Sequence, residues 1–72
     1  MLKVYSLPNC SQCDATIKTL QTKKIEFEKV DMSKDEEAYN RVKSLGYMAA
    51  PVVVVDNDNH WSGFRPDKIA SL

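Results

Sequence analysis

Two cysteines, Cys10 and Cys13, stand two residues apart at the point where an N-terminal strand is expected to give way to a helix. Residues three apart lie on one face of a helix, and the β-carbons of a disulfide are only about 3.5 to 4.5 Å apart, so one turn can bring these thiols together. The free N–H groups and partial positive charge at a helix start stabilise a thiolate there. The spacing therefore indicates a redox pair in which Cys10 is the nucleophile.

Two other interpretations of the cysteine pair are open. A purely structural disulfide is disfavoured, because closing so short a loop removes little conformational entropy from the unfolded chain. Half of a zinc site is the second, but tetrahedral zinc needs four ligands, and the chain adds only His60 and carboxylates such as Asp14. A zinc or iron–sulfur module would need ligands from outside this chain. The surrounding sequence is therefore needed to choose between a redox pair and a metal site.

Length and composition limit the remaining classes. A chain of 72 residues with 43% hydrophobic residues is expected to form a single domain over residues 1–72. Ten basic and ten acidic residues give a formal net charge of zero with no separate basic block, which disfavours nucleic-acid binding. The N-terminal residues do not resemble a secretion signal, and no apolar stretch approaches membrane length. We expect a cytoplasmic monomer that does not bind membranes, in a compartment where such a cysteine pair is more often catalytic than structural.

Hydrophobic periodicity and turn residues predict seven elements in the order strand, helix, strand, helix, strand, strand, helix. The expected ranges are 2–6, 11 to about 23, 25–30, 33–46, 52–55, 60–62 and a short helix after Pro66.

The two longer helices each have an apolar face at helical spacing, and the last helix is expected to bury two side chains. A capping box from Ser33 to Glu36 predicts the start of the second helix, and Gly46 its left-handed end. The predicted inward residues are Cys13, Ile17 and Leu20 in the first helix, Ala38, Val42 and Leu45 in the second, and Ile69 and Leu72 in the last.

The connections predict how the strands pair. The first two strands are joined through a helix and should be parallel, whereas the last two are joined by a tight turn and should be antiparallel. Residues 52–55 are four consecutive valines, which suits a strand buried on both faces. The prediction is an α/β fold with a mixed four-stranded sheet flanked by three helices, in which a cysteine pair after the first strand is typical of a thioredoxin-like redox site.

Three motifs extend this prediction over the whole chain. They are Cys10-Ser11-Gln12-Cys13, Ala50-Pro51-Val52-Val53 and the heptapeptide Trp61-Ser62-Gly63-Phe64-Arg65-Pro66-Asp67. Together they resemble the NrdH-redoxins, which are small glutaredoxin-like proteins of thioredoxin fold. The resemblance implies a thiol–disulfide oxidoreductase without a bound cofactor. It would donate electrons to the large subunit of class Ib ribonucleotide reductase and receive them from NADPH through the FAD enzyme thioredoxin reductase.

Two positions argue against glutathione as the reductant. Related glutaredoxins place a cation three residues before the first cysteine and an acid after a glycine turn, whereas this chain has Leu7 and Arg65 at those positions. Each lost or reversed contact to a charged ligand costs about 1.5 to 3 kcal/mol. We expect weak or no glutathione binding, although Lys3, Lys18 or Lys68 could supply a cation and a glutathione-dependent dithiol glutaredoxin stays the alternative.

Roles for the site residues follow from thiol chemistry and from the resemblance. Cys13 is expected to resolve the mixed disulfide formed by Cys10, with its ionisation discouraged by Asp14. Ser11 and Gln12 should influence the reduction potential and contact the partner.

The other motif residues are expected to bind a substrate strand or to maintain the structure. Pro51 should be a cis-proline that exposes the Ala50 backbone to a substrate strand, unless it only begins a strand. Phe64 is assigned equally to the core or to the partner surface. His60 is expected at an exposed strand end without a catalytic or ligand-binding role. Structural roles are assigned to Trp61 in the core, to Arg65 and Asp67 as hydrogen-bonding residues of the loop, and to Ser62, Gly63 and Pro66.

Overall fold

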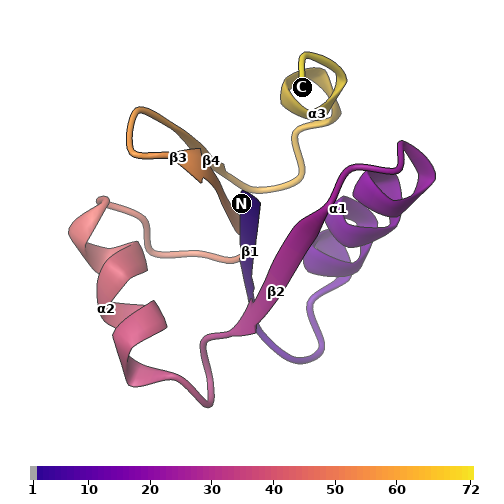
Figure 1. Cartoon of the computed structure of the whole chain (residues 1–72). Helices are drawn as coiled ribbons and strands as arrows, with labels where there is room; N and C mark the ends of the chain where they lie inside the picture. Colours follow the sequence, from indigo (N-terminus) through magenta and orange to yellow (C-terminus); the bar gives the residue numbers. More distant parts are fainter. Residues whose placement is uncertain (1) are drawn as a thin grey trace.

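The computed structural model describes residues 2–72, which form seven elements around one sheet (Figure 1). Their bounds are β1 (Leu2–Ser6), α1 (Ser11–Thr22), β2 (Phe27–Asp31), α2 (Glu36–Ser44), β3 (Val52–Asp56), β4 (Asn59–Ser62) and α3 (Pro66–Ala70). The predicted order of elements and the α/β class are confirmed.

The strands of residues 2–72 form one mixed sheet in the order β2-β1-β3-β4. β1 pairs in parallel with β2 and antiparallel with β3, so Val4 lies between Lys29 and Val53. β3 and β4 form the predicted antiparallel hairpin. The central position of β1 matters for the site, because the chain leaves this strand to enter the cysteine segment.

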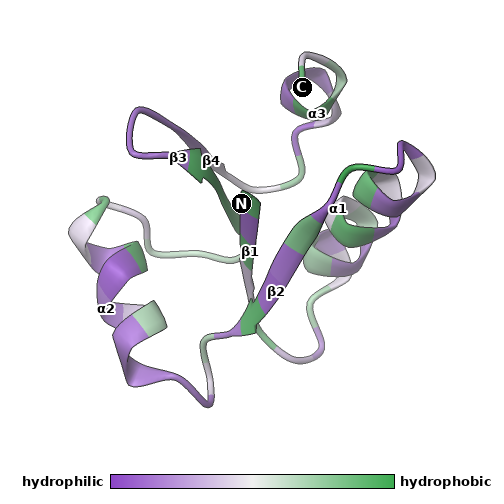
Figure 2. Cartoon of the chain, in the orientation of Figure 1, coloured by the Kyte–Doolittle hydropathy of each residue, from purple (hydrophilic) through white to green (hydrophobic). Residues whose placement is uncertain are grey.

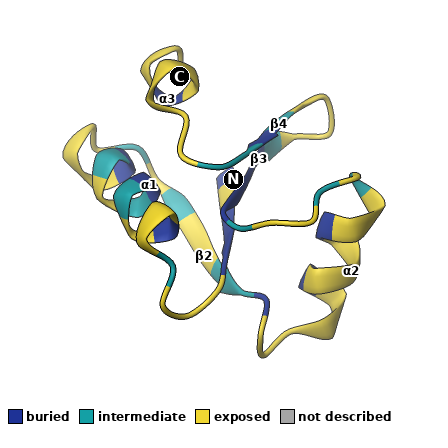
Figure 3. Ribbon diagram, turned by 180° about the vertical axis from the view of Figure 1, so that it is seen from behind, coloured by how far each residue is buried: buried dark blue, intermediate teal, exposed yellow. Residues whose placement is uncertain are grey.

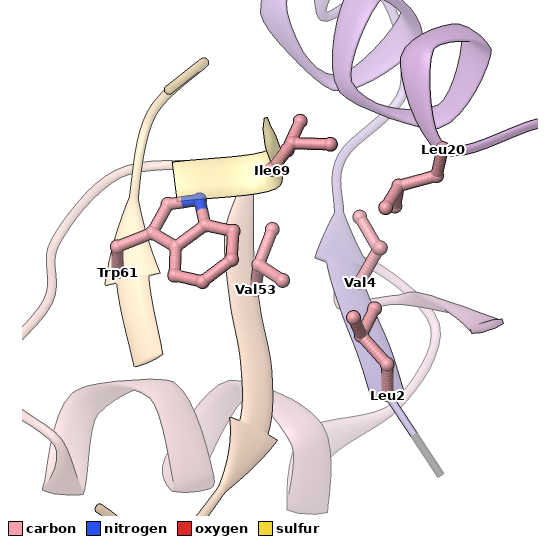
Figure 4. Close-up of a cluster of buried hydrophobic side chains, with 6 residues drawn as sticks. All are labelled: Leu2, Val4, Leu20, Val53, Trp61 and Ile69. Atoms are coloured by element: carbon pink, nitrogen blue, oxygen red, sulfur yellow. The ribbon is translucent and has the colours of Figure 1, made fainter. Parts of the chain in front are cut away.

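Helices cover both faces of the sheet, with α1 and α3 on one side and α2 on the other (Figure 1). The side chains between the sheet, α1 and α3 form one buried cluster, shown in Figure 4. Its members are Leu2, Val4, Leu20, Val53, Trp61 and Ile69. This cluster fixes α1, and therefore the cysteines at its start, against the sheet.

A second buried cluster lies between the sheet and α2. Its members are Tyr5, Met32, Ala38, Val42, Val52 and Val54. Because Val53 belongs to the first cluster while Val52 and Val54 belong to the second, the prediction that β3 is buried on both faces is confirmed. Hydrophobic and buried residues accordingly concentrate in the central strands, whereas α2 presents a largely hydrophilic, exposed outer surface (Figures 2 and 3).

The start of α2 differs from the prediction. The N-cap is Asp35, whose Oδ1 accepts a 3.1 Å hydrogen bond from the Ala38 amide, so the predicted capping box at Ser33 is wrong. The Ser33 amide and hydroxyl instead donate to Oδ1 of Asp31, at 2.9 and 2.6 Å, and form a turn before the helix. The end is as predicted, since Gly46 has a φ of 92° directly after the cap residue Leu45.

Two smaller predictions, on Ile25 and Leu72, are also wrong. Ile25 lies outside β2, because its amide bonds to the Leu20 carbonyl and completes the end of α1. On α1, Thr16 is buried together with the predicted Cys13 and Leu20, and its hydroxyl donates to the Gln12 carbonyl, while Ile17 is half-buried and packs against the first cluster as predicted. Leu72 is 42% exposed rather than inward, since α3 already ends at Ala70.

Candidate active site

Cys10 is the N-cap residue of α1, and Cys13 lies in the first turn of that helix. Cys10 has an extended backbone, with φ −113° and ψ 106°, and its Sγ accepts a 3.2 Å hydrogen bond from the Cys13 amide. The two residues are joined by a disulfide and their α-carbons are 5.2 Å apart. The first sulfur therefore occupies the position where the N–H groups of the helix are unpaired, which favours a thiolate on Cys10 after reduction.

The two sulfur-bearing residues differ in accessibility. Cys13 is 1% exposed and belongs to the buried side of α1, whereas Cys10 is half-buried at the surface. Cys10 is therefore the more accessible residue of the disulfide.

The segment that precedes β3 lies beside Cys10. The Ala50–Pro51 peptide bond is cis, Pro51 is buried, and Ala50 is half-buried. Ala50 lines a shallow surface hollow together with the cysteine segment, and the other lining residues are Leu7, Pro8, Asn9, Cys10, Ser11 and Gln12. Ala50 and Cys10 therefore face the same hollow.

The heptapeptide brings a third segment to the same place. The Gly63 amide donates a 2.8 Å hydrogen bond to the Pro51 carbonyl, and the Phe64 amide donates to Oε1 of Gln12 at 3.2 Å. The φ of Gly63 is 86°, a conformation that side chains with a β-carbon rarely adopt. Residues 63 and 64 thus join the start of α1 to the cis-proline segment.

Arg65 and Asp67 pair with each other at the start of α3. The Arg65 Nε and NH2 groups donate to the two carboxylate oxygens of Asp67 at 3.1 and 3.0 Å. This hydrogen bonding lowers the pKa of Asp67 and raises the pKa of Arg65. The charge of Arg65 is therefore balanced by Asp67, so Arg65 should repel a positively charged group of glutathione less than a free arginine would. The argument against glutathione binding then depends mainly on Leu7.

The two aromatic residues of the heptapeptide lie in different environments. Trp61 is 4% exposed in the first buried cluster, as expected of a core residue, and within residues 2–72 its buried Nε1 has no hydrogen-bond partner. Phe64 is 36% exposed, which places it at the surface rather than in the core. Of the two alternatives for Phe64, the structure favours the surface.

The sequence analysis missed a contact between Tyr47 and His60. The Tyr47 hydroxyl lies 2.7 Å from Nδ1 of His60 and 3.2 Å from its carbonyl oxygen, and the two rings meet edge to face. His60 is half-buried, so the prediction that it is exposed is wrong. No local pattern links two residues 13 apart, because the contact depends on the path of the loop between α2 and β3.

An apolar pocket adjoins the cysteine hollow and was also missed. It shares Leu7 and Ala50 with that hollow and is further lined by Met32, Tyr39, Val42, Lys43, Tyr47, Met48 and Ala49. Met48 is 99% exposed at its rim, and the Lys43 ammonium lies 5.3 Å from the centre of the Tyr39 ring. The surface beside Cys10 is therefore apolar on the side of α2.

Residues 2–72 contain no group of three or more His, Cys, Asp or Glu side chains placed to hold a metal ion. Among the same residues, no helix has both the length and the apolar character needed to cross a membrane.

The structure combines a four-stranded mixed sheet and three helices with a disulfide-forming cysteine pair at the start of α1. These features define a thioredoxin-fold thiol–disulfide oxidoreductase. The glutaredoxin family model matches residues 2–61. The glutaredoxin-like protein NrdH of Lactococcus lactis subsp. lactis is 39% identical over 72 residues, covering 100% of this chain and 99% of that protein. NrdH of Salmonella typhimurium is 37% identical over 71 residues, covering 99% and 86%.

A solved structure gives the same result. The NrdH-redoxin of Escherichia coli superimposes with a TM-score of 0.92 at 32% identity, covering 99% of this chain and 92% of that chain. The chain therefore belongs to the glutaredoxin family and, within it, to the glutaredoxin-like NrdH redoxins. The resemblance found in the sequence motifs is confirmed.

Proposed function

We propose that this redoxin donates electrons to the large subunit of class Ib ribonucleotide reductase and is itself reduced by NADPH through thioredoxin reductase and its FAD. The observation that carries the proposal is the half-buried Cys10 at the N-cap of α1, beside Ala50, in a chain similar to NrdH proteins over its whole length. The proposed setting is the cytoplasm, where thiols are kept reduced.

The choice of thioredoxin reductase over glutathione has two supports. The Escherichia coli relative is described as having a thioredoxin-like activity profile. In this chain the residue three positions before Cys10 is Leu7, which is exposed and lines the apolar pocket, so it offers no charge to a glutathione carboxylate. An apolar surface beside the cysteines suits a protein reductant better than a small charged tripeptide.

The first chemical step is attack by the Cys10 thiolate on a substrate disulfide. A bond forms between Cys10 Sγ and one substrate sulfur, the substrate S–S bond breaks, and the second substrate sulfur leaves as a thiolate. The start of α1 favours the attacking thiolate, since the Cys13 amide points at Cys10 Sγ. Ala50, Ser11, Gln12 and Phe64 are proposed to contact the partner during this step.

The second step resolves the mixed disulfide. Cys13 loses its proton and attacks Cys10 Sγ, the S–S bond between Cys10 and the substrate breaks, and the substrate sulfur that was bound to Cys10 leaves as a thiolate. Two electrons have then passed to the substrate, and the redoxin holds the Cys10–Cys13 disulfide seen in the structure. Because Cys13 is buried, it is proposed to act only on this internal sulfur.

The proposal is tested by NADPH consumption with class Ib ribonucleotide reductase as the electron acceptor. One assay supplies thioredoxin reductase and the other glutathione with glutathione reductase. We expect turnover with thioredoxin reductase and little with glutathione. Efficient turnover only in the assay that supplies glutathione and glutathione reductase would instead identify a glutathione-dependent glutaredoxin.

Two matched variants separate the roles of the cysteines. Cys13→Ser should accumulate a mixed disulfide with the substrate, detected as a covalent complex that reductant dissolves. Cys10→Ser, which keeps one thiol, should form none. A stable complex through Cys13 in the Cys10→Ser variant would reverse the proposed roles.

A further inference from the structure

The connection between β1 and α1 is short, and hydrogen bonds fix both of its ends. At its start, the Ser6 carbonyl accepts a 2.9 Å hydrogen bond from the Met32 amide. At its end, the Cys10 carbonyl accepts a 3.1 Å hydrogen bond from the Asp14 amide, the first backbone bond of the helix. Residues 7–9 therefore have to turn the chain from the strand into the helix without moving either end.

Asn9 makes this turn with a left-handed backbone conformation, at a φ of 58°. Pro8 cannot adopt such a conformation, because its ring holds φ at about −65°. Leu7 precedes that proline and is therefore biased to extended conformations. The left-handed conformation consequently falls to Asn9, and asparagine is among the residue types that tolerate it best.

The conformation of Asn9 sets the direction in which the chain enters Cys10. Cys10 has the extended backbone of an N-cap residue, and its Sγ accepts a 3.2 Å hydrogen bond from the Cys13 amide. A hydrogen bond to the charged form of a thiol favours that form. A rotation of the peptide that joins Asn9 to Cys10 would turn Sγ away from this amide, so the stabilisation of the thiolate depends on the residue before it.

Core packing does not impose the conformation of Asn9. Its side chain is exposed, and it lines the surface hollow that contains Cys10. Sparsely populated backbone conformations are concentrated at functional sites, where the surrounding structure holds them. The position of Asn9 directly before the attacking cysteine gives its conformation such a function.

We infer that Asn9 is a positioning residue whose left-handed backbone directs Cys10 Sγ at the Cys13 amide and so keeps Cys10 reactive as a thiolate. The inference rests on the part of the proposed function in which Cys10 attacks the substrate disulfide. It assigns the effect to the backbone of Asn9 and not to its carboxamide.

Two substitutions separate the backbone of Asn9 from its side chain. Asn9→Val removes the carboxamide and introduces a β-branched side chain that disfavours a positive φ, whereas Asn9→Gly removes the carboxamide and permits a positive φ. Lys24→Val is the matched control, because Lys24 is also exposed and also has a φ of 58°, but it follows the opposite end of α1. The control introduces the same backbone strain away from the cysteines.

The measurement is the pH profile of Cys10 alkylation in the reduced protein. The Cys10 thiolate displaces iodide from iodoacetamide and forms a thioether, so the rate follows the thiolate fraction as the pH is raised. Peptide mass spectrometry assigns the product to Cys10. We expect the midpoint of the profile to move upward by about one pH unit in Asn9→Val and to keep the wild-type value in Asn9→Gly and Lys24→Val.

Three results would overturn the inference. One is an unchanged midpoint in Asn9→Val, and another is an equal shift in Lys24→Val, which would be a general effect of strain. The third is a shift in Asn9→Gly as large as that in Asn9→Val, because the carboxamide would then be responsible. If Asn9→Val does not fold, Asn9→Ala takes its place, since alanine disfavours a positive φ less strongly than valine. The midpoint should then move upward by a smaller amount, and an unchanged midpoint would again overturn the inference.

The result is separable from the test of the proposed function. Alkylation needs neither a reductase nor a protein substrate, so the Asn9 effect can appear in a protein that fails with thioredoxin reductase. A protein that turns over with thioredoxin reductase but has equal midpoints in Asn9→Val and the wild type would keep the proposed function and contradict this inference.

Discussion

The Tyr47 hydroxyl lies 2.7 Å from Nδ1 of His60 and joins the loop before Pro51 to strand β4. The same hydroxyl also lies 3.2 Å from the His60 carbonyl, so a single side chain makes two contacts with one residue. Ser62 adds a third link, since its hydroxyl donates to the Ala49 carbonyl at 3.3 Å. These contacts hold the segment that places Ala50 beside Cys10.

Removing the Tyr47 hydroxyl should loosen this segment. We expect Tyr47→Phe to lower the free energy of unfolding by about 1 to 2 kcal/mol, because a partly buried hydrogen-bond partner is left unpaired. Urea denaturation measures the change. Tyr39→Phe is the matched control, since Tyr39 is about half exposed, and it should change stability by less than about 0.5 kcal/mol. Equal effects of the two substitutions would contradict a structural role for the Tyr47 contact.

The sequence predicted those features that depend on local pattern. The order of elements, the strand pairing and the position of Cys10 at a helix start follow from periodicity and turn residues, and the structure has all of them. The contacts of Tyr47 with His60 and of Gln12 with Phe64 could not be predicted in this way. Each depends on where a loop passes in space, and hydrogen bonds across such distances leave no periodic signal.

Local competition between polar side chains explains another error. Ser33 and Asp35 are both good N-cap residues, and the sequence alone favours Ser33 because Glu36 follows three residues later. In the structure the Ser33 hydroxyl donates a hydrogen bond to Asp31, and the side chain of Asp35 caps the helix instead. The pattern identified a helix start but not which of two acceptors would be used.

Substitution of the observed cap gives a direct test. Asp35→Ala should lower the free energy of unfolding by about 1 kcal/mol, since the Ala38 amide loses its acceptor. Ser33→Ala removes only an exposed hydrogen bond and should cost less than about 0.5 kcal/mol. Thermal or urea unfolding of both variants measures the difference. A larger loss of unfolding free energy in Ser33→Ala than in Asp35→Ala would support the predicted capping box at Ser33.

The pairing of Arg65 with Asp67 predicts an acid-dependent contribution to stability. Hydrogen bonding from Arg65 lowers the pKa of Asp67 in the folded state, so the unfolded state binds the proton more readily. The contribution is fully present above the ordinary aspartate pKa and is lost as the pH falls below about 4 and passes through the folded value. An NMR titration should show the pKa of Asp67 rising in Arg65→Gln. No change would mean that the pair does not form in solution.

The two apolar residues at the C-terminal end should differ sharply in their effect on stability. Ile69 is fully buried in the first cluster, and Ile69→Ala should cost about 2 to 5 kcal/mol through lost burial and the cavity left behind. Leu72 is 42% exposed, so Leu72→Ala should cost less than about 1 kcal/mol. Urea denaturation of both variants checks the assignment. Equal losses would favour the sequence-based prediction that both residues face inward.

The different accessibility of the two cysteines predicts which thiol reacts first after reduction. Cys10 is half-buried at the N-cap of α1, where its Sγ faces the Cys13 amide, whereas Cys13 is 1% exposed. A thiolate at a helix start has a lowered pKa and reacts faster than a buried thiol. Iodoacetamide in limiting amount should therefore alkylate Cys10 in large excess over Cys13, as measured by peptide mass spectrometry. Urea provides the control, because the unfolded chain should show nearly equal labelling. Preferential labelling of Cys13 in the folded protein would mean that the roles of nucleophile and resolving cysteine are exchanged.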